Sequence, residues 1–320
     1  MRRSTIALLS LIAAVGCGTA TTNNSQEAAD SQTTYYAPGT RRMERNVVNT
    51  NEPLTPQQLR RQTVDGYWDN FDFDADTAVI AYDTLDIFYA MADYVQLIEP
   101  ERADSLMESL MRRAESSRPV LDYLANICRM VLHDPNSPLR NDEYYIPVLR
   151  VLSSSPLMDE YERLAPAYDL ELALKNRIGN KANDITFTLA NGRRERLHNI
   201  EADYTLLMFN NPDCAMCSQL ISDVGSSPLL NEYLENGRLS IVAIYPDADI
   251  EAWRNYQSSM PAGWISGYDA GQIISRDRLY DLKAIPSLYL LDSDKRVLVK
   301  DGSDVALIEH VIATTEAQHE

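Results

Sequence analysis

Residues 204–217 read YTLLMFNNPDCAMC, and this stretch decides the fold of the second half of the chain. The run from Tyr204 to Phe209 is short and apolar, as is typical of a strand buried on both faces. An Asn-Asn-Pro-Asp turn follows, and then Cys214 and Cys217 at the expected start of a helix. Strand, turn and helix in this order predict one unit of an α/β sheet, with the cysteine pair at a helix N-terminus.

The position and spacing of the two cysteines are suited to thiol chemistry. Unpaired backbone N–H groups and the positive end of the helix dipole stabilise a thiolate at Cys214. The spacing of three residues places Cys217 on the same turn, close enough to form a disulfide. We therefore expect Cys214 to attack a substrate disulfide and Cys217 to resolve the mixed disulfide.

The segments around this stretch also have α/β character. Residues 185–189 and 196–197 flank Asn191-Gly192, a dipeptide preferred in tight hairpin turns. A cap at Ser227 and a stop at Gly237 delimit a helix between them. We expect strands at 204–209, 239–245, 287–291 and 297–299, and helices at 218–224, 228–235, 250–257 and 304–317. This order predicts a mixed sheet.

Residues 54–177 have the spacing of amphipathic helices instead. Val120, Leu124, Ile127 and Val131 recur at intervals of three and four, and a proline-rich breaker follows at 134–138. We expect an all-α domain of about five or six helices, with segments at 103–114, 119–131, 142–152 and 159–176 among them.

The N-terminus has the features of a targeting segment. Arg2 and Arg3 precede an apolar run from Ile6 to Val15, which is too short to span a bilayer but suits a signal peptide. Ala14-Val15-Gly16-Cys17 resembles a bacterial lipobox, so we expect residues 1–17 to be a lipoprotein signal peptide with lipid on Cys17. An ordinary signal peptide cleaved elsewhere is the alternative. Residues 18–53 are rich in Thr, Asn, Gln and Ser, which predicts a disordered tether.

The charge balance restricts the partners. Asp and Glu number 47 against 29 Lys and Arg, a formal charge of −18. Like-charge repulsion argues against nucleic acid or an anionic membrane surface as a partner. Contact with a membrane is therefore expected only through the lipid anchor, in the bacterial cell envelope and facing the periplasm.

From about Ile178 to the C-terminus the chain resembles the thioredoxin superfamily, and most of all its membrane-anchored members in the bacterial envelope. The resemblance is carried by the cysteine pair, its lead-in Asn210-Asn211-Pro212-Asp213, and Ile285-Pro286 before a strand. It implies a domain at 178–320 whose central mixed sheet has helices on both faces. The helical domain at 54–177 resembles an uncharacterised domain that precedes thioredoxin modules in bacterial secreted proteins.

The resemblance also implies how the site acts. In this family the proline at Pro286 is cis and packs against the active-site disulfide, and the backbone of Ile285 pairs with the substrate chain. The redox group is the Cys214–Cys217 disulfide itself, without a further cofactor. The implied partners are protein thiols and disulfides and an upstream electron donor.

Departures from the family pattern favour a reductase or an isomerase over an oxidant. Family members often hold a buried carboxylate before the motif or a Glu one turn after it, where this sequence has Met208 and Leu220. The motif also lacks the His of the strongest oxidants, and Asp213 disfavours a thiolate.

Other readings of the cysteines stay open. The pair could be a structural disulfide in a non-catalytic binding lipoprotein, with the helical domain carrying the interaction. A peroxiredoxin needs Thr where Asn211 stands, and a metal site needs ligands that a single CxxC does not supply, so no metal is expected. Cys128, on the apolar face of an expected helix, is interpreted as a buried free thiol. An aromatic set could line a substrate groove or pack in the core: Trp253, Trp264, Tyr268 and Tyr280.

Overall fold

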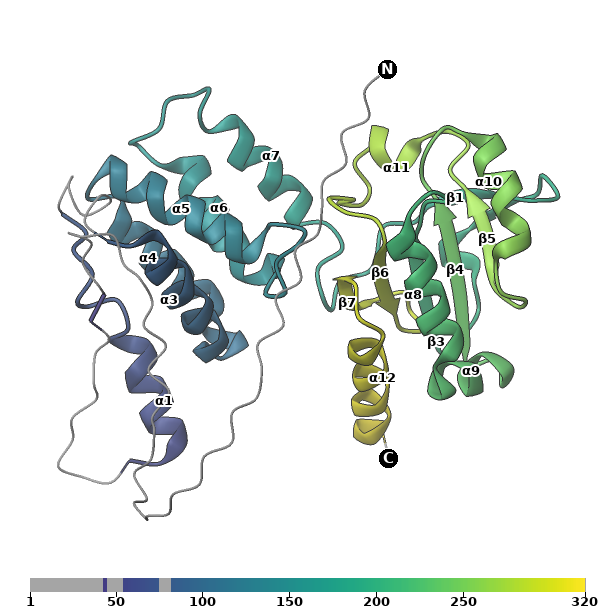
Figure 1. Ribbon diagram of the computed structural model, residues 1–320, viewed down its shortest axis with the longest axis horizontal. Coiled ribbons are helices and arrows are strands. Elements are labelled where there is room, and N and C mark those ends of the chain that lie inside the picture. The colour runs from purple at the N-terminus through teal and green to yellow at the C-terminus, as the bar shows by residue number, and fades with distance from the viewer. Residues whose placement is uncertain (1–42, 45–53, 75–81, 320) are drawn as a thin grey trace, which may run out of the picture. The chain divides into compact units, whose positions relative to one another are not determined.

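The computed structural model describes residues 43–44, 54–74 and 82–319 (Figure 1). The expected signal peptide with Cys17, and all of the expected tether at 18–53 except residues 43 and 44, lie outside the described residues. Residues 54–74 and 82–319 form the helices and strands discussed below.

Helices make up the part of the chain before the first strand. Thr55 and Gln58 form a capping box at the first of them, and Asp83 caps the next by accepting from the Leu85 N–H. The described residues of this region contain six α-helices: α1 (Pro56–Asp65), α3 (Thr84–Leu97), α4 (Ala103–Ala114), α5 (Arg118–Leu132), α6 (Asp142–Ser154) and α7 (Leu164–Ala173). A 3₁₀ turn, η1 (Pro100–Arg102), leads into α4.

These helices enclose one apolar core. The stripe predicted on α5 is confirmed, because Val120, Leu124, Ile127 and Val131 are at most 1% exposed. Cys128 is fully buried beside them as a free thiol, also as predicted. Met43, which falls within the expected tether, is buried in this core as well, and its N–H donates to Asp86 at 2.9 Å.

The last helix of this region is shorter than the sequence predicts. We expect a helix at 159–176, whereas α7 runs from Leu164 to Ala173. Asp159 and Glu162 form a separate turn before it, in which each side chain accepts from the other residue's N–H at 2.8 and 2.9 Å. Asn176 has a φ of 51°, a left-handed conformation that cannot continue a helix.

A seven-stranded mixed sheet follows, in the order β2-β1-β5-β4-β3-β6-β7. The parallel pairs are β3 with β4 and β4 with β5, while the remaining pairs are antiparallel. The central strand β3 is buried along its whole length, as its apolar run predicts. The strands are β1 (Thr186–Leu189), β2 (Arg194–Arg196), β3 (Tyr204–Phe209), β4 (Leu239–Tyr245), β5 (Ile265–Tyr268), β6 (Ser287–Leu291) and β7 (Val297–Gly302).

Apolar clusters lie on both faces of this sheet, since alternate residues of β3 belong to different clusters. Leu207 and Phe209 pack with Ile274 on one side, and Leu206 and Met208 pack on the side that α8, α9 and α12 cover. The helices are α8 (Ala215–Ser226), α9 (Pro228–Glu235), α10 (Ile250–Tyr256), α11 (Ile273–Arg276) and α12 (Val305–His319), with 3₁₀ turns η2 (Leu197–Asn199) and η3 (Gln257–Ser259). The predicted α/β fold class is confirmed. Within the described ranges, no helix has both the length and the apolarity needed to cross a membrane.

Strand β5 is absent from the sequence prediction. Its four residues are half-exposed apart from Gly267, so they lack the continuous apolar run of the other inner strands. Gly267 is needed for the packing, since a Cβ there would lie 2.5 Å from the Phe187 ring. The strand forms because β4 and β1 pair with it on either side.

Candidate functional site

The fold places Cys214 at the N-cap of α8, directly after the central strand. β3 ends at Phe209, and the turn that follows is held by Asn211, whose side-chain oxygen accepts from the Asp213 N–H at 3.2 Å. The Asn211 carbonyl accepts from the Cys214 N–H at 3.3 Å. The chain therefore enters the helix with Cys214 in an extended conformation and its side chain over the first turn.

Cys214 is half-exposed and its sulfur has two polar contacts. The N–H of Cys217 donates to the Cys214 Sγ at 3.1 Å. The Cys214 thiol in turn points to the carbonyl of Ile285 at 3.6 Å. A backbone N–H at a helix N-terminus can hold negative charge that develops on this sulfur.

Cys217 has a different environment, although it lies on the same turn. Its side chain is fully buried, and the Asn211 N–H donates to its Sγ at 3.5 Å. Burial, with a further contribution from the contact with Cys214, raises the pKa of the Cys217 thiol to about 12. At neutral pH the buried thiol keeps its proton.

Ile285-Pro286 lies against the cysteines because β6 pairs with β3. In this antiparallel pair Phe209 is opposite Ser287, so the end of β3 and the start of β6 meet at one edge of the sheet. The Ile285-Pro286 peptide bond is cis. The structure thus brings together four of the residues singled out in the sequence: Cys214, Cys217, Ile285 and Pro286.

Apolar residues lie beside the cysteine pair, together with a few polar side chains, of which Tyr256, Ser218 and Asp247 are not singled out in the sequence analysis. Met208 and Leu220 are buried in the cluster under α8. Tyr256 on α10 has a pKa raised by burial, against a smaller opposing effect from a hydrogen bond with Ser218. Asn211 also donates from its side chain to Asp247 at 3.0 Å. The sequence around the motif gives no signal for these contacts, because Tyr256 and Asp247 lie on segments that are distant from it in the sequence.

The aromatic set mainly serves packing. Trp253 is buried and its ring centroid lies 4.5 Å from that of Tyr268. Tyr280 is buried in the core on one face of the sheet, and Trp264 packs against the cluster on the other. The core interpretation therefore holds for Trp253 and Tyr280.

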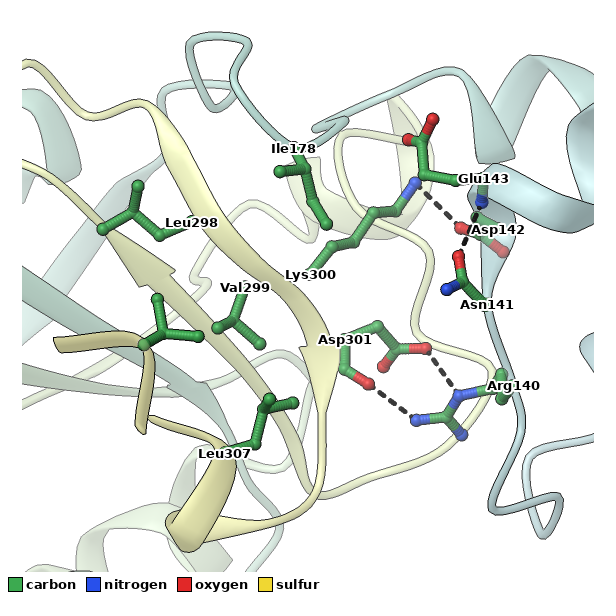
Figure 2. Close-up of a pocket in the computed structure, with 11 residues that line it drawn as sticks. Arg140, Asn141, Asp142, Glu143, Ile178, Leu298, Val299, Lys300, Asp301 and Leu307 are labelled. Carbon is green, nitrogen blue, oxygen red and sulfur yellow. Dashed lines mark hydrogen bonds and ion pairs between the residues drawn. The ribbon is translucent and has the colours of Figure 1, made fainter. Parts of the chain in front are cut away.

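A cavity of about 320 Å³ lies away from the cysteines, where α6 meets β7 and α12 (Figure 2). Its walls are apolar at Ile178, Leu298 and Leu307, and Arg140 is paired with Asp301 at one side. None of the cysteines lines it. Within the described ranges, no three His, Cys, Asp or Glu side chains gather in a way that could hold a metal ion.

The comparisons with known proteins concern both parts of the chain. Residues 16–176 match the family model described as Domain of unknown function (DUF5106). A thioredoxin-like protein from Bacteroides caccae is 36% identical over 83% of this chain and 97% of its own, with a TM-score of 0.79. The C-terminal domain of an uncharacterized protein from Bacteroides fragilis is 39% identical over 43% of this chain and 98% of its own, with a TM-score of 0.42. The thioredoxin domain of a thiol-disulfide oxidoreductase from Bacteroides vulgatus is 18% identical over 43% of this chain and 97% of its own, with a TM-score of 0.38. None of the curated proteins matches the chain.

The similarity to the Bacteroides caccae protein extends over the helices as well as the sheet, since it covers 83% of this chain. It agrees with the mixed sheet and with the resemblance predicted from the cysteine pair and Ile285-Pro286. The chain therefore belongs to the thioredoxin-like proteins, and its N-terminal half belongs to the DUF5106 family.

Proposed function

We propose that the protein is a thiol–disulfide oxidoreductase that acts on protein disulfides through Cys214 and Cys217. The observation that carries the proposal is the unequal pair at the start of α8. One sulfur is half-exposed and accepts a backbone N–H at 3.1 Å, and the other is buried with a pKa raised to about 12. Such a difference suits an accessible nucleophile and a buried resolving thiol.

In the first step the Cys214 thiolate attacks one sulfur of a substrate disulfide. The substrate S–S bond breaks, a mixed disulfide with Cys214 forms, and the departing substrate sulfur takes up a proton. In the second step Cys217 loses its proton and attacks the Cys214 sulfur, which releases the second substrate thiol. Two electrons pass from the cysteine pair to the substrate disulfide, and a donor dithiol returns them later.

The buried thiol supports the isomerase side of the proposed reductase or isomerase activity. Because burial raises the pKa of Cys217, the second step is slow at neutral pH and the mixed disulfide on Cys214 is long-lived. During that time another thiol of the substrate can attack the mixed disulfide, which rearranges the substrate bonds without net oxidation. In this proposal the carbonyl of Ile285, 3.6 Å from the Cys214 sulfur, would accept from a substrate N–H during this interval.

We also propose that the protein works in the cell envelope as a lipoprotein anchored through Cys17. The support for this is the sequence alone: the basic residues Arg2 and Arg3, the short apolar run, and the lipobox-like Ala14-Val15-Gly16-Cys17. Substrates would then be proteins outside the cytoplasm, where disulfides persist.

The oxidoreductase proposal predicts that purified protein reduces insulin when supplied with dithiothreitol, and that Cys214→Ser abolishes this. Cys128→Ala is the matched control, because it removes a thiol buried in the helical core, a different cluster from the one under α8, and should leave the rate unchanged. The midpoint potential of the pair should lie between roughly −280 and −120 mV, the span of catalytic thioredoxin-fold pairs.

The opposite result would favour the binding lipoprotein. A pair whose disulfide resists millimolar glutathione, with a potential below about −300 mV, behaves as a structural bond. Together with failure to reduce insulin, that would end the oxidoreductase proposal and leave the helical region as the seat of function.

A further inference from the structure

The segment Arg278–Lys283 leads into Ile285-Pro286 and is held by the helical region. Two amide side chains, those of Asn176 and Asn183, donate to the Leu279 carbonyl at 2.8 and 2.7 Å. Asn176 follows α7 and is 5% exposed, and its side-chain oxygen also accepts from the Asn183 N–H at 2.7 Å. Asn176, at the end of the helical region, thus binds the segment directly and also binds Asn183, the second residue that donates to the Leu279 carbonyl.

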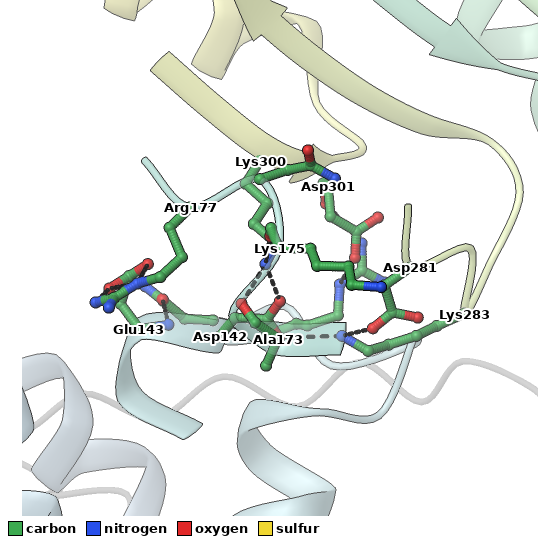
Figure 3. Close-up of polar contacts among 12 residues, drawn as sticks. Asp142, Glu143, Ala173, Lys175, Arg177, Asp281, Lys283, Lys300 and Asp301 are labelled. Atoms are coloured by element: carbon green, nitrogen blue, oxygen red, sulfur yellow. Dashed lines mark hydrogen bonds and ion pairs between the residues drawn. The ribbon is translucent and has the colours of Figure 1, made fainter. Parts of the chain in front are cut away.

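A buried ion pair fixes the same segment two residues before Ile285. Lys283 Nζ lies 3.0 Å from Asp142 at the start of α6 and 2.9 Å from Asp281 (Figure 3). The side chains of Lys283 and Asp142 are only 9% and 6% exposed. The second oxygen of Asp142 lies 2.8 Å from Lys300 on β7, so one helical carboxylate holds two parts of the sheet domain.

A second buried pair reaches the residue after Pro286. Ser287 donates from its hydroxyl to Asp301 at 2.8 Å. Asp301 is paired in turn with Arg140, two residues before Asp142, at 3.2 Å, and these side chains are 8% and 11% exposed. The Arg140 guanidinium also donates to the Asp301 carbonyl at 2.8 Å (Figure 2).

The cis peptide is therefore flanked by two residues that are linked to the start of α6: Lys283 pairs directly with Asp142, and Ser287 is linked to Arg140 through Asp301. We propose that Asp142 and Arg140 are positioning residues of the redox site, which hold Lys283 and Ser287 and so fix the Ile285 carbonyl against Cys214. This inference rests on the proposed function, and it gives the helical region a role: it sets the surface on which a protein substrate is aligned.

Buried charges restrict the position of the segment before Ile285. Burial alone would raise the pKa of Asp142 and lower that of Lys283, but pairing outweighs burial, since the pKa of Asp142 is lowered and that of Lys283 is raised. Both groups are therefore charged at neutral pH. A buried charge that loses its partner is strongly disfavoured, so the segment has one arrangement in which all charges are paired.

The test compares Lys283→Met and Asp142→Asn with Glu143→Gln. Glu143 is the residue after Asp142, and its carboxylate pairs with Arg177 inside the helical region and not with the segment. Lys283→Met leaves Asp142 paired with Lys300. The inference can therefore still be tested with Lys283→Met if Asp142→Asn does not fold. Circular dichroism of each full-length variant establishes that it is folded.

In the folded variants Lys283→Met and Asp142→Asn, we expect the KM for insulin to rise about tenfold, as for a displaced binding group. Reaction of Cys214 with a small aromatic disulfide should change by less than about twofold, because that reagent needs no alignment. Glu143→Gln should match the wild type in both measurements.

Hydrogen exchange separates this inference from the proposed function. Amides of residues 279–288 should exchange about tenfold faster in Lys283→Met and not in Glu143→Gln. If the wild type reduces no insulin but exchange follows this pattern, the proposed function is wrong and the positioning contact stands. Unchanged KM and exchange in folded Lys283→Met, or equal changes in Glu143→Gln, would overturn the inference.

Discussion

Cys214 and Cys217 are three positions apart, yet the helix gives each a separate environment. The N-cap leaves Cys214 beside solvent and beside an N–H donor, whereas the first inward position of α8 removes Cys217 from water. Desolvation disfavours a charged sulfur, and no side chain of opposite charge compensates for it at Cys217 among the causes of its raised pKa. The proposed assignment of Cys214 as nucleophile and Cys217 as resolving thiol therefore rests on the difference in their burial.

This difference predicts the pattern of alkylation. Limiting iodoacetamide at neutral pH should label Cys214 in the reduced wild type, as mapped by peptide mass spectrometry. In Cys214→Ser, labelling of Cys217 should be slow and should still accelerate above pH 9, because burial, the largest cause of its raised pKa, remains in this variant. Preferential labelling of Cys217 or of Cys128 in the wild type would remove the assignment of the nucleophile.

At the scale of the elements, the sequence predicts what is encoded locally. The run from Tyr204 to Phe209 and the cap at Ser227 each carry their own signal, and both are confirmed. The capping box of Thr55 and Gln58 is a local signal of the same kind and could have identified α1. β5 could not be found in this way, because its stability comes from its partners on both sides.

Some parts of the candidate site likewise have a local sequence signal, and others have none. The cysteine motif and Ile285-Pro286 are each visible as short sequences, and their contact follows once the family is identified. The pairing of Asp142 with Lys283 has no local signature, because it joins a helix start to a loop far along the chain. No pattern within either segment indicates the other.

The packing of β5 predicts that Gly267→Ala and Gly225→Ala differ in their effect on the free energy of unfolding. In Gly267→Ala the new Cβ would lie 2.5 Å from the buried ring of Phe187, so we expect a loss of about 1–3 kcal/mol from the free energy of unfolding. Gly225→Ala on α8 is the control, since no atom lies within 4 Å of its Cβ and alanine favours a helix by up to about 1 kcal/mol. Urea unfolding measures both, and equal midpoints for the two variants would contradict the packing argument.

At the scale of the whole molecule, the chain joins two families, and the helical region contributes to the sheet region through buried charge. Asp142 and Arg140 both lie near the start of α6, yet their partners belong to β7 and to the segment before β6. These pairs link the helical region to the sheet region through buried side chains. This link agrees with the similarity to the Bacteroides caccae protein, which spans both regions.

The molecule as a whole is predicted to be attached to a membrane through lipid on Cys17. Metabolic labelling with a clickable fatty acid should mark the wild type and should be lost in Cys17→Ala, because the thioether lipid requires that sulfur. Cys128→Ala, which removes a buried cysteine of the helical core, should keep the label. Equal labelling of the wild type and Cys17→Ala, or no label in either, would refute the lipid anchor.

The antiparallel pairing of β3 with β6 also has a consequence for the order of assembly. Phe209 and Ser287 are opposite each other but far apart along the chain, so their contact closes a long loop and carries an entropic cost. Both thiols are present as soon as α8 has been made, whereas the Ile285 carbonyl reaches Cys214 only when that loop has closed. A newly made chain therefore has its thiols before it has the proposed substrate surface, and under the proposed function recovery of activity would report the completion of the sheet.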